Sequence, residues 1–235
     1  MNNDEVARAF ERLGTPQIAD AALRKKVSLR VAPYGLVAVI SGSRMAGRAL
    51  PVRHFGSVDV FLEAMQSADA GDVLVIDNGG RTGEGCIGDL TVLEARAARL
   101  AGIVLWGTHR DSPQLKQIGL PVFSYGTCLA GPQRLDPRTV DALQNARFGS
   151  LEVNRNDFVF ADDDGCIFVA DDAVTEVLKA AAAIGQTEVR QAEKIANGQR
   201  LAVQLKVADY LTRRSADPAY TFRMHLREIG GAIEE

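Results

Sequence analysis

The amino-acid sequence predicts an α/β protein whose parallel strands are joined by helices. The first observation is a strand–helix–strand pattern over residues 72–111, with apolar runs at 72–77 and 103–106 around a segment of helical spacing. The second is another apolar run at 121–123, which would add a third parallel strand. The third is size, because 235 residues with 46% hydrophobic and 24% charged side chains are typical of a globular protein.

Composition excludes several classes of function. The net charge of −3 offers no basic surface for nucleic acid. The three cysteines, Cys86, Cys128 and Cys166, are widely spaced, which indicates reduced thiols in a cytoplasm. We see neither a secretory signal nor an apolar run of about 18 residues that would span a membrane. We therefore expect a cytoplasmic protein with no nucleic-acid or membrane partner.

Helices and strands are expected before the central unit. An amphipathic helix covers residues 6–13, and a second begins at Thr15, a good N-cap that precedes a proline suited to the first helical turn. Strands are expected at 37–40 and 46–52. Ser57 can cap a third helix.

The chain after the third parallel strand predicts a hairpin and then helices. Asp164 and Gly165 form the turn signal of the hairpin. The expected elements are strands at 150–153, 157–160 and 166–169, a long helix from 171 to about 195, its continuation to 210, and a last helical segment from 217 that stops at 230–231.

Polar residues cluster after both strands of the central unit, at 78–89 and 107–111. Ligand sites in such units lie beyond the carboxyl ends of the strands. The backbone N–H groups of residues 88–91 lie at the start of a helix, where N–H groups without a helical partner favour the binding of an anion. In the plainer interpretation, Asp89 only caps this helix.

The second cluster ends in Arg110 and Asp111. Arginine binds a carboxylate through two hydrogen bonds, and aspartate is a hard oxygen ligand for Mg²⁺. Taken alone, Arg110 and Asp111 could be an ion pair on the protein surface. Because Asp89 lies opposite them, we expect a helix start, a guanidinium and two carboxylates to converge on one crevice.

Two further patterns have weaker functional interpretations. Residues 83–88 fit G-x-G-x-x-G, but five residues separate the strand from the first glycine, and no carboxylate follows the second strand. A nucleotide site is therefore disfavoured. His54, His109, His225 and Cys86 have no partners at recognisable spacing and are expected to be structural or incidental.

Several of these segments resemble the RraA-like family, which includes class II 4-hydroxy-4-methyl-2-oxoglutarate/4-carboxy-4-hydroxy-2-oxoadipate aldolases. The similarity covers about residues 10–200. Its most specific part is Gly88-Asp89 followed by Arg110-Asp111. The similar segments are 13–21, 77–80, 88–90, 107–111 and 161–165.

The resemblance implies a fold and an assembly. It implies a swivelling α/β/α domain with a mixed sheet and extra N- and C-terminal helices. One domain would span residues 1–235, with a core at about 10–200 and a C-terminal helical extension at about 200–235. The family forms a homotrimer or a dimer of trimers, with sites near subunit boundaries.

The resemblance also implies a divalent-metal-dependent lyase. Such an enzyme cleaves a C–C bond of a 2-oxo acid through a pyruvate enolate and also decarboxylates oxaloacetate. Asp111 would hold the metal, Mg²⁺ most readily or else Mn²⁺, and Asp89 and Arg110 would be catalytic. The substrate would contact Gly88, Asp89, Leu90, Thr91 and Arg110.

The family leaves two questions open for this chain. Its aldolases use a glutamate from a neighbouring subunit, for which Glu188 and Glu193 are candidates. Residues 81–86 and Trp106 depart from the family pattern, which leaves the exact substrate open. A second class in the family, non-catalytic inhibitors of ribonuclease E, lacks the metal-binding aspartate, and Asp111 therefore favours an enzyme.

Overall fold

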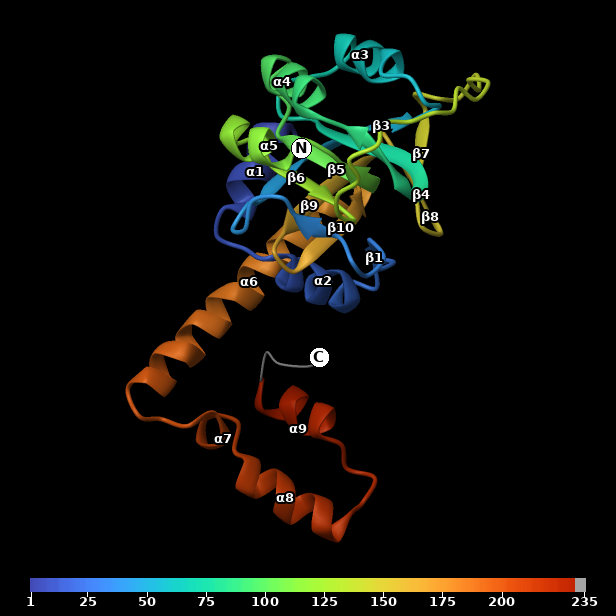
Figure 1. Cartoon of the computed structure of the whole chain (residues 1–235). Coiled ribbons are helices and arrows are strands. Elements are labelled where there is room, and N and C mark those ends of the chain that lie inside the picture. The colour runs from blue at the N-terminus through green and yellow to red at the C-terminus, as the bar shows by residue number, and fades with distance from the viewer. Residues whose placement is uncertain (231–235) are drawn as a thin grey trace.

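One eight-stranded mixed sheet organises the structure, a computed structural model that describes residues 1–230 (Figure 1). The strands run in the order β1-β10-β9-β3-β4-β5-β6-β2. Their bounds are β1 Arg30–Val31, β2 Val37–Ala38, β3 Met45–Arg53, β4 Val73–Ile87, β5 Gly102–His109, β6 Val122–Ser124, β9 Asp157–Asp162 and β10 Gly165–Ala170. A separate hairpin pairs β7 Asn145–Phe148 with β8 Leu151–Asn154. The predicted α/β class with a mixed sheet is confirmed.

Helices cover the outer faces of this sheet (Figure 1). The helices α3, α4 and α5 pack over the parallel strands, and α1, α2 and α6 pack over β9 and β10. Their bounds are α1 Asn3–Phe10, α2 Thr15–Arg24, α3 Asp59–Gln66, α4 Asp89–Ala97, α5 Ser112–Ile118 and α6 Asp171–Ala196.

Strand β3 joins the two parts of the sheet because it changes partners along its length. Its first residues pair antiparallel with β9, and residues 49–53 pair parallel with β4. Strands β4, β5 and β6 continue in parallel. The carboxyl ends of β3, β4 and β5 therefore meet at one edge, which is where a ligand site is expected.

The alternation of side chains along β4 explains how the sheet is buried on both faces. Leu74 and Ile76 face the helices α3 to α5, whereas Val73 and Val75 face a second core that includes Phe148 of β7. Successive side chains of a strand point to opposite faces, and both sets here are apolar. This two-sided burial fixes the register of β4 and hence the place where its polar end emerges.

Three local predictions were wrong. Gly14, not Thr15, is the N-cap of α2, because Asp162 binds both the N–H and the hydroxyl of Thr15, at 2.8 and 2.6 Å. Ser57 does not cap α3, whose N-cap is Val58. Residues 78–87 are not a loop after a short strand, since β4 continues through them with irregular pairing to β5.

The C-terminal helices extend away from the sheet (Figure 1). The buried residues of α6 end at Ile184, and the rest of the helix leads to α7 Leu201–Gln204, α8 Val207–Ala216 and α9 Phe222–Ile229. Rings of α8 and α9 pack together, including Tyr210 against Phe222 at 5.0 Å. Gly230 caps α9, and Gly231 lies outside the described residues. Among residues 1–230, every helix is too short or too polar to cross a membrane.

Candidate functional site

The two polar clusters begin two helices at neighbouring strand ends. Gly88 is the N-cap of α4, directly after β4, and Asp111 is the N-cap of α5, two residues after β5 ends at His109. Asp111 adopts the left-handed conformation, with φ of 58°. Aspartate and asparagine tolerate this conformation better than other residues with a side chain. The turn therefore suits the carboxylate that it carries.

The structure brings these two turns into contact. The backbone N–H of Asp89 donates to Asp111 Oδ2 at 3.3 Å, and Arg110 Nε lies 3.6 Å from the same oxygen. The backbone N–H of Arg110 donates to the carbonyl of Ile87 at 2.9 Å. The start of α4, the guanidinium and the carboxylate thus meet as expected.

Glycines make this approach possible. A methyl group at Gly88 would overlap Asp111 Oδ2 and come within 3.2 Å of Arg110 Nε. A methyl group at Gly85 would lie 3.1 Å from Arg110 Cβ, and one at Gly131 would lie 3.1 Å from its Nη1. Two of the three glycines that fit a dinucleotide pattern in the sequence, Gly85 and Gly88, therefore make room for Arg110 and Asp111, and Gly85 pairs with β5 inside a strand.

Asp89 is the first residue of α4 and lies at the site. Its Oδ1 accepts a hydrogen bond from the N–H of Leu90 at 2.8 Å, but the N-cap of α4 is Gly88, so the plainer interpretation of Asp89 as the helix cap is wrong. An acidic group is stabilised at the positive end of a helix. A bound anion would share the N–H groups of this first turn with the Asp89 carboxylate.

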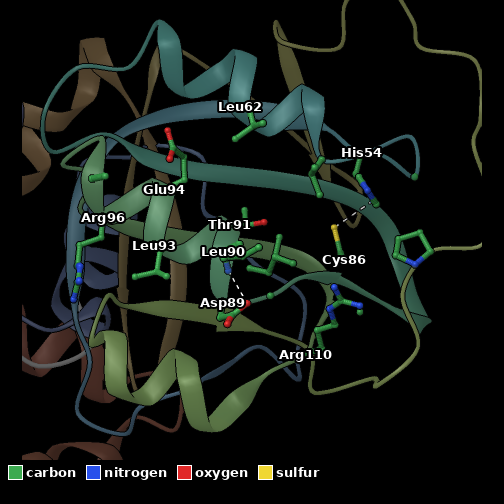
Figure 2. A pocket seen from close by; sticks show the side chains of 17 residues that line it. His54, Leu62, Cys86, Asp89, Leu90, Thr91, Leu93, Glu94, Arg96 and Arg110 are labelled. Carbon is green, nitrogen blue, oxygen red and sulfur yellow. Dashed lines mark hydrogen bonds between the residues drawn. The ribbon is translucent and has the colours of Figure 1, made fainter.

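A cavity of about 810 Å³ opens beside these residues (Figure 2). Asp111 lies outside it, in an adjoining hollow that Arg110 also borders, together with Ser112, Thr127 and Cys128. Arg110 therefore stands between the cavity and the carboxylate. The cavity is lined by His54, Gly56, Val58, Leu62, Gly85, Cys86, Ile87, Gly88, Asp89, Leu90, Thr91, Leu93, Glu94, Arg96, Ala97, Arg110 and Pro132.

His54 was assigned a structural role from the sequence, yet it lines this cavity beside Cys86 (Figure 2). Its Nδ1 lies 2.8 Å from Asn78 Oδ1 and 3.3 Å from Cys86 Sγ. Asn78 Oδ1 also accepts from Arg134 at 2.8 Å, so the His54 nitrogen is the donor in its contact with Asn78. His54 follows β3 directly, and the same strand-end rule that selected Arg110 applies to it.

Burial sets the protonation of this pair. Burial lowers the pKa of His54, opposed by its hydrogen bond to Asn78, which leaves the imidazole neutral near pH 7. Burial raises the pKa of the Cys86 thiol well above its usual value, and the nearby Glu84 carboxylate adds to that. Cys86 is therefore a protonated thiol, and its proximity to His54 does not make it a nucleophile.

Arg134 ties the loop after β6 to the edge of the sheet. It forms an ion pair with Glu84 at 2.9 Å, and both side chains are largely buried. Burial alone would raise the pKa of Glu84, but the hydrogen bonds and charge of Arg134 hold that pKa below its usual value. A backbone hydrogen bond from Gly85 to Ala130, at 2.7 Å, holds the same loop.

His109 supports the turn that carries Arg110 and Asp111. It is the last residue of β5 and is buried, with Nδ1 2.7 Å from the hydroxyl of Ser124 and Nε2 2.9 Å from that of Ser112. Burial lowers the pKa of His109. A neutral imidazole between two hydroxyl groups fixes the start of α5.

The residues present fit a divalent cation that retains most of its water. Mg²⁺ commonly takes only one or two protein carboxylates, and here Asp111 and Asp89 are available. The glycine at 88 leaves room for the Asp111 carboxylate, which is about one-third exposed. Among residues 1–230, no cluster of three or more histidine, cysteine or acidic side chains forms a closed metal site.

Comparison with known proteins identifies the family. The model of the RraA-like family, described as Aldolase/RraA, matches residues 15–168. The chain belongs to the RraA-like family. The matched span contains both turns of the site, the strands β3 to β6, β9 and the first residues of β10.

RraA-like relatives with curated names cover part of the chain. A "Putative 4-hydroxy-4-methyl-2-oxoglutarate aldolase" of Bacillus cereus is 36% identical over 106 residues, which cover 45% of this chain and 65% of the relative. A protein of the same name from Hahella chejuensis is 29% identical over 53% of this chain and 75% of the relative. The chain thus matches less than two thirds of the length of the Bacillus cereus relative.

Solved structures match over more of the chain. An uncharacterized protein from Pseudomonas syringae pv. tomato superposes with a TM-score of 0.72 and 25% identity, over 84% of this chain and 95% of that one. Streptomyces coelicolor RraAS2, described as an unusual member of the RNase ES inhibitor RraA protein family, superposes with a TM-score of 0.70 and 26% identity, over 80% and 96%. Both aldolase and inhibitor names therefore occur among similar proteins.

Proposed function

We propose that this RraA-like protein is a divalent-metal-dependent lyase that cleaves a C–C bond of a 2-oxo acid through a pyruvate enolate. The observation that carries the proposal is the meeting of Arg110, the Asp111 carboxylate and the start of α4 beside a cavity. The names of the relatives from Bacillus and Hahella support the same chemistry.

The proposed roles follow from the charge that the reaction develops. Cleavage next to a carbonyl leaves an enolate, and a lyase must stabilise that growing negative charge. The first-turn N–H groups from Gly88 to Thr91 would hold the substrate carboxylate. Arg110 would place its guanidinium at the enolate oxygen. Leu90 would contribute its backbone to the same turn.

The cleavage step moves one proton and breaks one bond. Asp89, acting through a water, would take the proton of the substrate hydroxyl. The C–C bond then breaks, its electron pair forms the enolate, and the former alcohol leaves as a carbonyl product. Protonation of the enolate gives pyruvate. Decarboxylation of oxaloacetate reaches the same enolate without a hydroxyl group, so it is a natural side activity.

Asp111 would hold the cation, with Asp89 near it. A bound divalent cation, Mg²⁺ or alternatively Mn²⁺, would supply Lewis-acid stabilisation of the enolate. Arg110 borders both the cavity and the hollow that contains Asp111, so its guanidinium would lie between the substrate carboxylate site and the residue that would hold the cation.

The same proposal covers the assembly and setting of the protein. We infer one RraA-like domain with a C-terminal helical extension, working as a homotrimer or dimer of trimers in the cytoplasm. Glu188 and Glu193 lie on the exposed part of α6, where a neighbouring subunit could use them. Within one chain, Glu188 accepts a hydrogen bond from Gln17 at 2.6 Å.

A second candidate function rests on the similarity to Streptomyces coelicolor RraAS2. In that case the chain would bind a ribonuclease and regulate it without catalysis. Asp111 counts against this alternative, because a binding protein has no need of a carboxylate beside the guanidinium.

An assay with metal and chelator tests the proposed function. Purified protein with Mg²⁺ should release pyruvate from 4-hydroxy-4-methyl-2-oxoglutarate and from oxaloacetate, and excess EDTA should stop both reactions. Protein-free samples with Mg²⁺ correct for spontaneous decarboxylation. Ribonuclease binding that is insensitive to EDTA, with no pyruvate from either compound, would establish the regulator instead.

The Asp89→Asn variant tests the assignment of the base. Asparagine can still accept the hydrogen bond from Leu90, so the first turn of α4 should keep this contact. It cannot take a proton, and aldol cleavage should fall by about 10²-fold while oxaloacetate decarboxylation falls much less. The measurement is kcat for both substrates with the same protein preparation. Equal losses would remove Asp89 from the role of base.

A further inference from the structure

The cavity is larger than a pyruvate unit requires. Its volume of about 810 Å³ lies within the range of roughly 300–1,000 Å³ that is usual for sites of drug-sized ligands. Of the groups proposed to hold the pyruvate unit, Asp89 and Arg110 lie on the side of the cavity opposite Leu62 (Figure 2). The rest of the space is available to whatever the substrate carries beyond its 2-oxo acid portion.

The wall of this remaining space is predominantly apolar. Helix α3 contributes Val58, directly before it, and Leu62, and helix α4 contributes Leu93. Cys86 adds an uncharged thiol to the wall. These side chains come from separate elements and border the same space.

The ionisable side chains around this wall are His54, Glu94 and Arg96. His54 is neutral near pH 7 because burial lowers its pKa. Arg96 donates to the carbonyl of Ile118 at 2.9 Å and stands at the opposite edge from Arg110 (Figure 2). Glu94 is an anion and would repel another. Arg96 keeps its positive charge, but its side chain is directed away from Leu62 (Figure 2). A carboxylate placed against Val58 and Leu62 would therefore lose water without gaining a cation, which is unfavourable.

We propose that the preferred substrate carries an uncharged, apolar substituent on its hydroxyl-bearing carbon, in place of a second carboxylate. This inference rests on the proposed function, because it assumes that the 2-oxo acid end binds at α4 and Arg110. The substrate class is the aldol adduct of pyruvate with an apolar aldehyde or ketone. Its cleavage returns that carbonyl compound and pyruvate, with no net oxidation or reduction.

Binding of substrate analogues tests the inference without requiring turnover. The probes are 2-oxobutanoate, 2-oxopentanoate and 2-oxohexanoate, together with 2-oxoglutarate, titrated calorimetrically into the full chain with Mg²⁺. Each added methylene should lower Kd by about fourfold. 2-Oxoglutarate should bind more weakly than 2-oxopentanoate, which has the same carbon chain without the second carboxylate. Equal or tighter binding of 2-oxoglutarate would overturn the proposal.

A substitution in the wall tests where the substituent lies. Leu62→Arg adds a cation at a side chain that is 45% exposed, and it should improve 2-oxoglutarate binding relative to 2-oxopentanoate by about tenfold or more. Leu211→Arg is the matched control, because Leu211 is also 45% exposed but lies on α8. Leu62→Arg could instead change the oligomeric state and leave the preference for 2-oxopentanoate over 2-oxoglutarate unchanged. That result would show that the wall is a subunit interface, and it would overturn the proposal.

The lyase activity and the apolar substituent can be refuted independently of each other. If pyruvate is released in the metal assay but Kd is independent of chain length, the inference about the substituent is wrong and the lyase proposal stands. If Kd falls with chain length but no aldol substrate yields pyruvate, the wall binds apolar 2-oxo acids and the lyase proposal is wrong. The corresponding kinetic test compares kcat/KM for 4-hydroxy-2-oxoheptanoate and 4-hydroxy-4-methyl-2-oxoglutarate.

Discussion

Replacing Asp111 with asparagine should abolish metal-dependent release of pyruvate while the protein stays folded. Asparagine has nearly the same shape and also tolerates the left-handed conformation that residue 111 adopts, with φ of 58°. It lacks the negative charge that a hard cation requires. Loss of several kcal/mol of transition-state stabilisation corresponds to a decrease in kcat of about 10³-fold. Steady-state pyruvate release at saturating Mg²⁺ measures this decrease in kcat.

Asp111→Ala separates the charge of this residue from its conformation. Alanine should lose the same activity and also about 1 kcal/mol of unfolding free energy, because a left-handed backbone is unfavourable for it. Asp163→Asn is the control, since Asp163 lies in the β9–β10 turn and binds the backbone of Gly42. Full activity in Asp111→Asn would show that the carboxylate is not the metal ligand.

Replacing Arg110 with lysine should decrease kcat/KM by about 10²-fold although the positive charge is retained. A guanidinium presents a planar fork to two oxygens, and an ammonium group is a point charge on a flexible stem. Removing one preorganised donor at a developing oxyanion has an effect of this size in other enzymes. The measurement is kcat/KM for aldol cleavage, with thermal unfolding as the check on the fold.

Arg96→Lys is the matched control for that variant. Arg96 also lines the cavity, but its guanidinium donates to the carbonyl of Ile118 on α5. A lysine there should leave kcat nearly unchanged. If Arg110→Lys keeps wild-type kinetics, or if both variants lose activity equally, Arg110 has no specific role at the enolate.

The core of the site could be predicted from the sequence because it depends on local patterns and one general rule. The strand–helix–strand pattern placed Gly88 and Asp111 at the ends of neighbouring parallel strands, and such ends share an edge. The structure has this β4–α4–β5 unit and brings the two turns into contact. The roles of these residues in catalysis stay predictions.

Other features depend on contacts that no local pattern reveals. Asp162 lies far from Thr15 in the chain, yet its carboxylate binds Thr15 and shifts the start of α2. Arg134 comes from a loop without helix or strand, and it donates to the same Asn78 oxygen that His54 contacts. The long course of β4 was hidden because glycines usually indicate a loop. Here Gly85 and Gly88 allow Arg110 and Asp111 to approach the strand end.

The left-handed turn at residue 111 also bears on how such a scaffold can diverge. The turn accepts aspartate and asparagine with little difference in backbone energy, and codons for these two residues differ by a single base. One point mutation can therefore remove the anionic group while preserving the architecture around it. On this scaffold, a lineage could lose catalysis and keep only the binding of a partner. The reverse mutation could restore catalysis, and neither change would pass through an unfolded ancestor.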